Sequence, residues 1–236
     1  MRPTVRLSNA LSRLGYEVRR TDAMRRSLLF KHNEVDLVLD VGAAKGQYAI
    51  ELRRHGYEGR IISFEPLDEP YAELEQHASN DPKWTAIQKA VGAQTENTAI
   101  NIAGNSDSSS ILPMLNRHVE VAPHTAYVGT QDIEVRPLDQ LALQDVQSAK
   151  NSILKIDTQG YERSVLDGAH EVLKLLRGVQ IELSLVPLYE GVMPYVEAIE
   201  RLENEGFVLQ LIEPGFRDAA TQQLLQADGI FLRPGT

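Results

Sequence analysis

Acidic side chains lie at the ends of two apolar segments of this chain, and a glycine-rich turn follows the first. Asp40 lies at the end of the apolar segment 35–41 and precedes Gly42 and Gly46. Glu65 ends the next apolar segment. Glycine allows a close backbone approach to a ligand, and the free N–H groups at the start of the following helix can bind it. An acidic residue about 20 positions further along can accept hydrogen bonds from both hydroxyls of a ribose, so the two segments together predict a nucleotide-cofactor site.

The spacing of the glycines favours one cofactor over another. A dinucleotide site typically needs G-x-G-x-x-G, in which the second glycine makes room for a pyrophosphate. Here Ala44 takes that second place. A loop with two glycines and no pyrophosphate pocket suits S-adenosylmethionine (SAM), whose charge lies on an amino-acid tail and a sulfonium. The alternatives are an NAD-dependent oxidoreductase and a doubly wound domain with an incidental turn.

A third acidic group belongs to the segment from Lys155 to Glu162. Lys155 and Asp157 lie two positions apart on a predicted strand and therefore project to one face. Asp157 lies at the end where open α/β sheets bind ligands. Its carboxylate could orient the methionine amino group, take part in removing the proton of an acceptor, or bind a divalent ion. The alternative is a helix N-cap, with Gly160 and Glu162 in the first turn.

The segment 179–185 alternates between polar and apolar residues. This alternation places Gln180, Glu182 and Ser184 on one face of a strand, where they could line a polar cleft. This arrangement would place Glu182 and Asp157 in one site, since they would lie on neighbouring strands. Paired carboxylates either share a proton or bind a metal. An edge strand with a solvated face is the alternative.

The long polar segment 104–130 holds the only histidines that we expect outside helices after the first strand. His118 and His124 are candidate general bases for an alcohol, because histidine titrates nearest neutral pH. Exposed histidines without a catalytic role are the alternative. A loop of this length in a compact domain is typically a lid, a binding loop or disordered. We expect this one to cover the molecule that reacts with the cofactor.

Strands and helices alternate along most of the chain. Helical periodicity and helix-stop residues predict helices over 3–20, 21–31, 47–55, 69–79 and 162–176. Apolar or alternating segments predict strands over 35–41, 60–65, 85–91, 97–102, 133–137, 152–157, 179–186, 207–212 and 229–232. This rhythm is typical of a parallel sheet with helices on both faces. We expect an N-terminal helical cap over 1–34 and one domain over 35–236.

Composition limits the partners and the location. A net charge of −9 argues against nucleic acid, because phosphate backbones require a surplus of Lys and Arg. The basic patch of Arg19, Arg20, Arg25 and Arg26 is interpreted as a solvated helix face. The absence of cysteine fits a reducing cytoplasm. No apolar run approaches the roughly 20 residues that span a bilayer, and no signal peptide is recognisable. We therefore expect a cytoplasmic protein. The sequence leaves open whether it forms a homodimer.

The motifs in combination resemble the FkbM family of class I SAM-dependent methyltransferases. They are the glycine loop 40–46, Phe-Glu-Pro at 64–66, Ala-Val-Gly at 90–92, the serines 108–110 and the segment 155–162. Ala44 departs from the asparagine that the family often has. The resemblance implies a Rossmann-like fold with a central, mostly parallel seven-stranded sheet and an antiparallel last strand. It also implies O-methylation of a small molecule such as a sugar, a glycolipid or a polyketide.

The residues and the resemblance together give a set of candidate roles. The predicted cofactor-binding residues are Asp40, Gly42, Ala43, Gly46, Gln47, Tyr48, Glu65, Pro66, Ala90, Val91, Ser110 and Asp157. The catalytic candidates are Asp157, His118, His124 and Glu182, with Asp157 and Glu182 as ligands if a divalent metal is used. One alternative is methyl transfer to nitrogen, although 157–160 lacks the Asn/Asp-Pro-Pro-aromatic element common in base methylation. A non-catalytic SAM-binding protein is the other.

Overall fold

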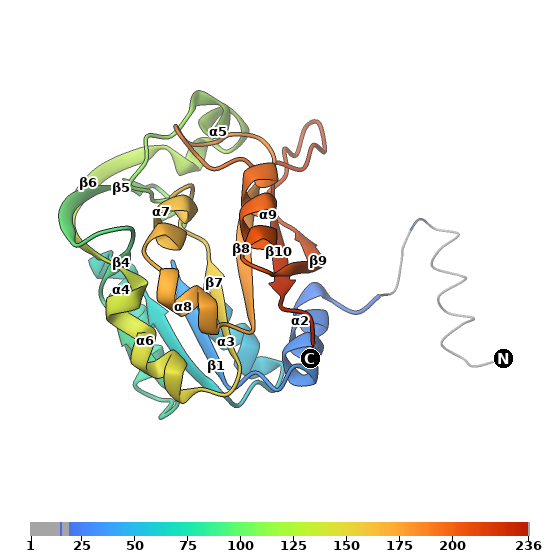
Figure 1. Ribbon diagram of the computed structural model, residues 1–236. Coiled ribbons are helices and arrows are strands. Elements are labelled where there is room, and N and C mark those ends of the chain that lie inside the picture. Colours follow the sequence, from blue (N-terminus) through green and yellow to red (C-terminus); the bar gives the residue numbers. More distant parts are fainter. Residues whose placement is uncertain (1–14, 16–18, 236) are drawn as a thin grey trace.

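A seven-stranded sheet forms the centre of the protein (Figure 1). The computed structural model describes residue 15 and residues 19–235, so nearly all of the predicted helix 3–20 lies outside the described residues. β10 is antiparallel to both of its neighbours, and the other pairs are parallel. The mostly parallel sheet with an antiparallel final strand is therefore confirmed. The order across the sheet is β3 (Trp84–Ile87), β2 (Arg60–Phe64), β1 (Leu37–Val41), β7 (Ser152–Ile156), β8 (Gly178–Ser184), β10 (Gln226–Leu232) and β9 (Val208–Pro214).

Helices cover both faces of this sheet, because its central strands are apolar on both sides. In β1, Val38 belongs to a cluster with α2 (Asp22–His32), α3 (Gln47–Arg54) and α4 (Asp68–Ala78). Leu37 and Leu39 belong to a second cluster, with α6 (Leu138–Ser148), α7 (Glu162–Asp167), α8 (His170–Leu175) and α9 (Tyr195–Asn204). Alternate residues of one strand thus hold opposite helical layers, as predicted.

The structure also has a three-stranded sheet that the sequence patterns do not predict. The predicted strand 85–91 is wrong as one element, because β3 ends at Ile87 and β4 (Ala90–Val91) joins this second sheet. β4 pairs with β6 (Tyr127–Arg136), which pairs with β5 (Glu96–Ala103). Such strands are stabilised by pairing with strands that are distant in sequence, so the local sequence predicts them only weakly.

Two predictions about helices and loops are wrong in detail, and one helix was not predicted. The segment 104–130 is not a continuous loop, since it contains α5 (Asn116–Val121), a 3₁₀ turn (Pro123–Thr125) and the start of β6. The predicted helix 162–176 is two helices, α7 and α8. The helix α6 has no counterpart in the prediction.

Among the described residues, no helix combines the length and the apolar composition that crossing a membrane requires.

The helix α2 confirms the predicted helix 21–31. Thr21 is its N-cap and accepts a hydrogen bond from the amide of Met24 at 3.3 Å, which satisfies one of the free N–H groups of the first turn. Phe30 is buried in the cluster that α2 shares with α3 and α4. This contact holds α2 against the sheet, where it contributes to the site described below.

Candidate cofactor and acceptor site

The loop after β1 is held between the ends of its two neighbouring strands. The amides of Gly42 and Ala43 donate to the carbonyl oxygen of Phe64 at 3.1 Å, and the amide of Asp157 donates to that of Val41 at 3.1 Å. Gly42 has φ +74°, and a Cβ atom there would stand 1.8 Å from the carbonyl oxygen of Asp157. Only glycine permits this approach. The loop therefore meets β7 at the edge of the sheet where ligands bind.

Glu65 lies at one side of a cavity at the carboxyl ends of β1 and β2. Its buried carboxylate accepts hydrogen bonds from the amides of Ala44 (2.9 Å) and Leu67 (3.0 Å). Burial raises the pKa of Glu65 to about 7, against the effect of those two N–H groups. The cavity, of about 620 Å³, combines this hydroxyl-binding group with apolar walls that suit a flat base. The apolar lining residues include Phe64, Pro66, Ala90, Val91, Ile100 and Ile111.

A second cavity, of about 940 Å³, begins where the first ends. The two cavities have five lining residues in common: Gly42, Ala44, Asp107, Asp157 and Gln159. Most of the remaining wall of the second cavity is charged or polar, and consists of Arg26, Gln47, Tyr48, Glu51, Lys155, Gln180 and Asp228. Asp157 thus lies at the junction between an apolar cavity that contains Glu65 and a polar one.

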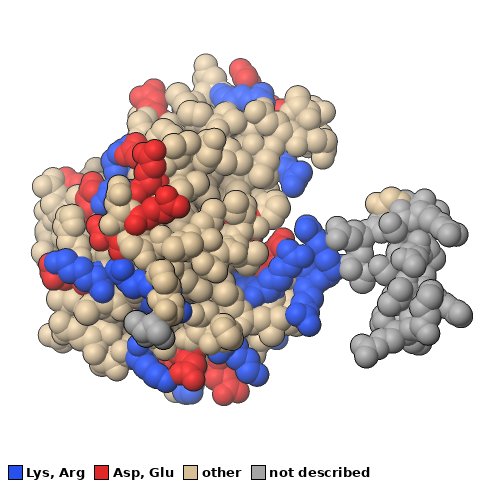
Figure 2. Space-filling model, turned by 45° about the vertical axis from the view of Figure 1, so that its right-hand side comes forward, with Lys and Arg blue, Asp and Glu red and all other residues tan. Residues whose placement is uncertain are grey.

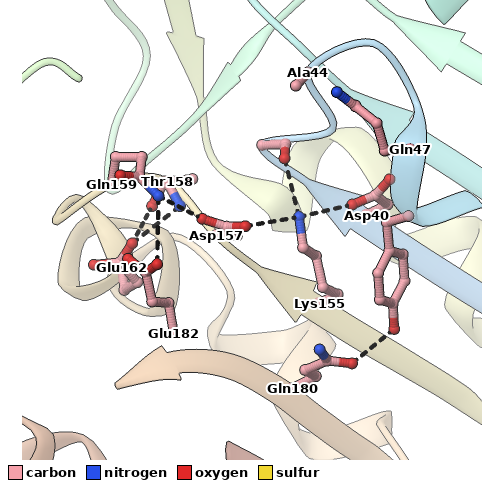
Figure 3. A network of polar contacts seen from close by, with 12 residues as sticks. Asp40, Ala44, Gln47, Lys155, Asp157, Thr158, Gln159, Glu162, Gln180 and Glu182 are labelled. Atoms are coloured by element: carbon pink, nitrogen blue, oxygen red, sulfur yellow. Dashed lines mark hydrogen bonds and ion pairs between the residues drawn. The ribbon is translucent and has the colours of Figure 1, made fainter. Parts of the chain in front are cut away.

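A row of polar side chains crosses the sheet next to the second cavity (Figure 3). Ser63, Asp40, Lys155 and Gln180 occupy matching positions on β2, β1, β7 and β8. Ser63 donates to Asp40 at 3.2 Å, and Gln180 accepts a hydrogen bond from the hydroxyl of Tyr48 at 2.7 Å. Because all four strand residues are buried, these partners replace the water that each polar group loses on folding.

Lys155 is the cation of this row. Its Nζ donates to the carbonyl oxygen of Gly42 at 3.0 Å and lies 3.1 Å from Asp40 Oδ1 and 3.6 Å from Asp157 Oδ2. Burial by itself lowers the pKa of Lys155, but the carboxylates of Asp40 and Asp157 outweigh it and raise that pKa above its ordinary value. Lys155 therefore stays protonated, and it holds the glycine loop against β7 rather than accepting a proton.

Asp157 and Glu182 come together around one amide. The Nε2 atom of Gln159 donates to Asp157 Oδ1 at 2.9 Å and to Glu182 Oε1 at 3.4 Å, as Figure 3 shows. Gln226 donates to the other oxygen of Glu182 at 2.7 Å. Burial and the charges of Asp157 and Glu162 raise the pKa of Glu182 well above its ordinary value. Within residues 19–235 no cluster of three or more His, Asp or Glu could hold a metal ion, so the structure lends the metal hypothesis no support.

Two structural alternatives from the sequence are wrong. Asp157 is not the N-cap of α7, whose N-cap position is Tyr161. Glu162 instead accepts hydrogen bonds from the amides of Thr158 (3.0 Å) and Gly160 (3.1 Å), which fixes the turn after β7. β8 is not an edge strand, since it lies between β7 and β10. Its polar residues face the interior of the protein.

Both histidine candidates lie away from the cavities. His118 is a buried residue of α5, with its ring centroid 5.3 Å from that of Tyr189, and burial lowers its pKa. His124 lies in the 3₁₀ turn, so the expectation that both lie outside helical segments is wrong. Neither lines a cavity. The geometry therefore gives no support to proton transfer by either residue.

The predicted site residues fall into two groups by position. Those that line a cavity are Gly42, Ala43, Gln47, Tyr48, Glu65, Pro66, Ala90, Val91 and Asp157. Those that line neither cavity are Asp40, Gly46, Ser110, Glu182, His118 and His124. Some of the second group support the walls: Ser110 donates to the carbonyl oxygen of Gln159 at 2.7 Å, and a side chain at Gly46 would collide with Trp84.

Several charged lining residues have no cofactor or catalytic role in the sequence analysis. Arg26 was expected on a solvated helix face, which is wrong: it is buried and forms ion pairs with Glu51 and Glu213. Asp228 leaves one signal in the sequence, an acidic residue inside an apolar strand, where aspartate is disfavoured. Asp107 leaves none. Arg26 and Asp228 show that α2 and β10 contribute to the second cavity.

The sheet order and the two strand-end motifs define a class I SAM-dependent methyltransferase. The model of the methyltransferase FkbM domain matches residues 40–209, a range that includes the glycine loop, Glu65 and Asp157. The chain belongs to the FkbM family of methyltransferases.

Several solved structures of methyltransferases are similar to this chain at low sequence identity. The magnesium protoporphyrin IX methyltransferase of Synechocystis with bound SAM has a TM-score of 0.48 and 11% identity, over 90% of this chain and 78% of that one. The Aeropyrum pernix fibrillarin with natively bound SAM has a TM-score of 0.46 and 12% identity, over 84% and 66%. A SAM-dependent methyltransferase from Aquifex aeolicus has a TM-score of 0.44 and 10% identity, over 91% and 90%. No curated protein matches the sequence.

Proposed function

We propose that this protein transfers the methyl group of SAM to a hydroxyl group of a small molecule, namely a sugar, a glycolipid or a polyketide-type product. The observation that carries this proposal is the pair of cavities that meet at Asp157. The residues present fit SAM: Glu65 for the ribose, Pro66, Ala90 and Val91 for the base, and the loop at Gly42 for the amino-acid tail. When bound, SAM supplies an electrophilic methyl group. The protein supplies orientation and the exclusion of water.

The polar second cavity favours a hydroxyl-rich acceptor among these classes. Its charged and amide side chains would lose water on binding, and an apolar acceptor would leave them without partners. Carboxylates outnumber cations in its wall, which disfavours an anionic acceptor. On the face shown in Figure 2, acidic and basic side chains form separate small groups rather than one basic surface, which agrees with an acceptor other than nucleic acid. A neutral sugar hydroxyl therefore fits best.

Calorimetric titration with S-adenosylhomocysteine (SAH), with NAD as the control, tests the cofactor. The acceptor is then tested by SAH release from SAM in the presence of methyl glycosides, macrolides or amines. Binding of SAH and methylation of a glycoside are expected. NAD binding alone would overturn the proposal. Methylation of amines alone would show a nitrogen acceptor, and SAH binding without any turnover would indicate a SAM-binding protein.

Replacing Asp157 by asparagine should lower turnover by about 100-fold, the effect of removing one oriented charge from an active site. Asparagine retains an acceptor for the 2.9 Å hydrogen bond from Gln159, so thermal unfolding should change little. Asp132→Asn, in an exposed part of β6, is the matched control and should keep full turnover. If the Asp157 variant loses turnover and also has a much lower melting temperature, the residue has a structural role instead.

A further inference from the structure

Asp228 projects into the second cavity from the strand beyond β8. β10 runs antiparallel to β8, with Asp228 opposite Glu182 and Ile230 opposite Gln180. Residues directly opposite one another in an antiparallel pair lie on the same face of a sheet. Asp228 therefore shares a face with the polar row that crosses the sheet, and it lines the cavity beside Gln180.

Of the described residues, four carboxylates line this cavity, and two of them already have fixed partners. Glu51 forms an ion pair with Arg26. Asp157 lies 3.6 Å from the Nζ atom of Lys155 and accepts a hydrogen bond from Gln159 at 2.9 Å. Both carboxylates therefore already have partners within the protein.

The other two carboxylates are Asp107 and Asp228. Asp107 is exposed on the loop after β5 and lines the cofactor cavity as well as the second one. Asp228 lines the second cavity alone, and within residues 19–235 it forms no ion pair. A half-buried carboxylate without a fixed cation is free to accept a hydrogen bond from a bound hydroxyl group.

The surroundings of Asp228 suit proton transfer near neutral pH. Burial, and then the charge of Asp157, raises the pKa of Asp228 to about 6, against the effects of Lys155, a hydrogen bond from Gln180, and Arg26. A general base is most effective when its pKa lies near the working pH. The titratable and charged groups that face it are Tyr48 of α3, Lys155 of β7, Asp157 after β7, Glu182 of β8, Glu213 of β9 and Arg26 of α2.

We propose that Asp228 takes the proton of the acceptor hydroxyl group in the second cavity; this rests on the O-methyl transfer proposed above. The acceptor oxygen forms a bond to the methyl carbon while the carbon–sulfur bond breaks and its electron pair stays on sulfur. The hydroxyl proton passes to the carboxylate of Asp228 and then to water. Asp157 and Lys155 hold the cofactor side of the site during this step.

The test compares Asp228→Asn with wild type and with the control Asp132→Asn, all as full chains. SAH affinity is measured by calorimetry, and turnover is measured with SAM and the methyl glycoside that the wild type methylates best. Asp228→Asn should lower kcat by about 100-fold and leave the SAH affinity within about twofold. With SAM kept saturating at every pH, so that the Glu65 ionisation does not contribute, the plot of kcat/KM for the glycoside against pH should lose its acidic limb near the pKa of about 6.

Asp228→Asn is expected to fold, so a loss of turnover would not come from unfolding. The pKa of Asp228 is higher in the folded chain than its ordinary value of 3.8, so the ionised carboxylate destabilises the fold above pH 6, and asparagine should maintain or raise the melting temperature. A kcat within about threefold of wild type, or an unchanged acidic limb, would overturn the role of Asp228. A wild-type protein that methylates no glycoside would instead overturn the proposed function itself.

Discussion

Replacing Lys155 by methionine should lower the free energy of unfolding by about 3–5 kcal/mol, the usual effect of removing one partner of a buried ion pair. Methionine keeps much of the side-chain length but removes the cation 3.1 Å from Asp40 Oδ1. Asp40 is fully buried, and the hydroxyl of Ser63 is the other group that donates to it among the described residues. Its negative charge would therefore remain without compensation. Chemical denaturation followed by circular dichroism measures the change.

A double variant distinguishes lost charge compensation from lost packing. Asp40→Asn combined with Lys155→Met should recover part of the stability, because the neutral amide removes the unpaired charge. Lys174→Met is the surface control: Lys174 pairs with Glu171 at 2.6 Å, and both side chains are exposed. Its loss should change the free energy of unfolding by less than about 0.5 kcal/mol. A loss below about 1 kcal/mol for Lys155→Met would show that Asp40 does not depend on this cation.

Replacing Glu65 by alanine should weaken SAH binding by at least about 100-fold. Hydrogen bonds to a charged group contribute about 1.5–3 kcal/mol each, and the carboxylate is placed to accept from two ribose hydroxyls. Calorimetric titration measures the dissociation constant. Because the carboxylate also accepts from the amides of Ala44 and Leu67, thermal unfolding without ligand must be measured in parallel. Unchanged SAH affinity would contradict the ribose-binding role.

The pKa of Glu65 gives a separate test that depends on pH. Burial raises this pKa to about 7, so about one tenth of the free protein carries the ionised group at pH 6. SAH affinity should therefore fall about tenfold between pH 8 and pH 6, because the ionised form accepts the ribose hydroxyls more strongly. Glu65→Gln should bind more weakly and show a flat profile over this range. A pH step that persists in Glu65→Gln would assign it to another group.

Local sequence patterns were sufficient to predict which strand ends meet at the first cavity. Apolar strands that end in a glycine turn or an acidic residue predict where β1, β2 and β7 stop, and parallel strands bring their carboxyl ends to one edge of the sheet. The positions of Gly42, Glu65 and Asp157 in the first cavity follow from this rule. Three of the FkbM motifs, 40–46, 64–66 and 155–162, lie in the same segments, which helped the family to be recognised from the sequence.

Only the tertiary structure showed which residues line the second cavity and where the candidate general bases lie. Arg26 and Asp228 come from α2 and β10, at opposite ends of the chain. They line one cavity because α2 packs on the sheet to which β10 belongs, where Arg26 also pairs with Glu213 of β9. His118 has the chemistry of a general base, but it is packed against Tyr189 outside the cavities. Local periodicity determines which residues form an element, whereas long-range packing determines which side chains face one another. The sequence by itself therefore determined the fold class and the positions of Gly42, Glu65 and Asp157 at the first cavity. The second sheet and the residues that form the second cavity were determined only by the packing of distant elements.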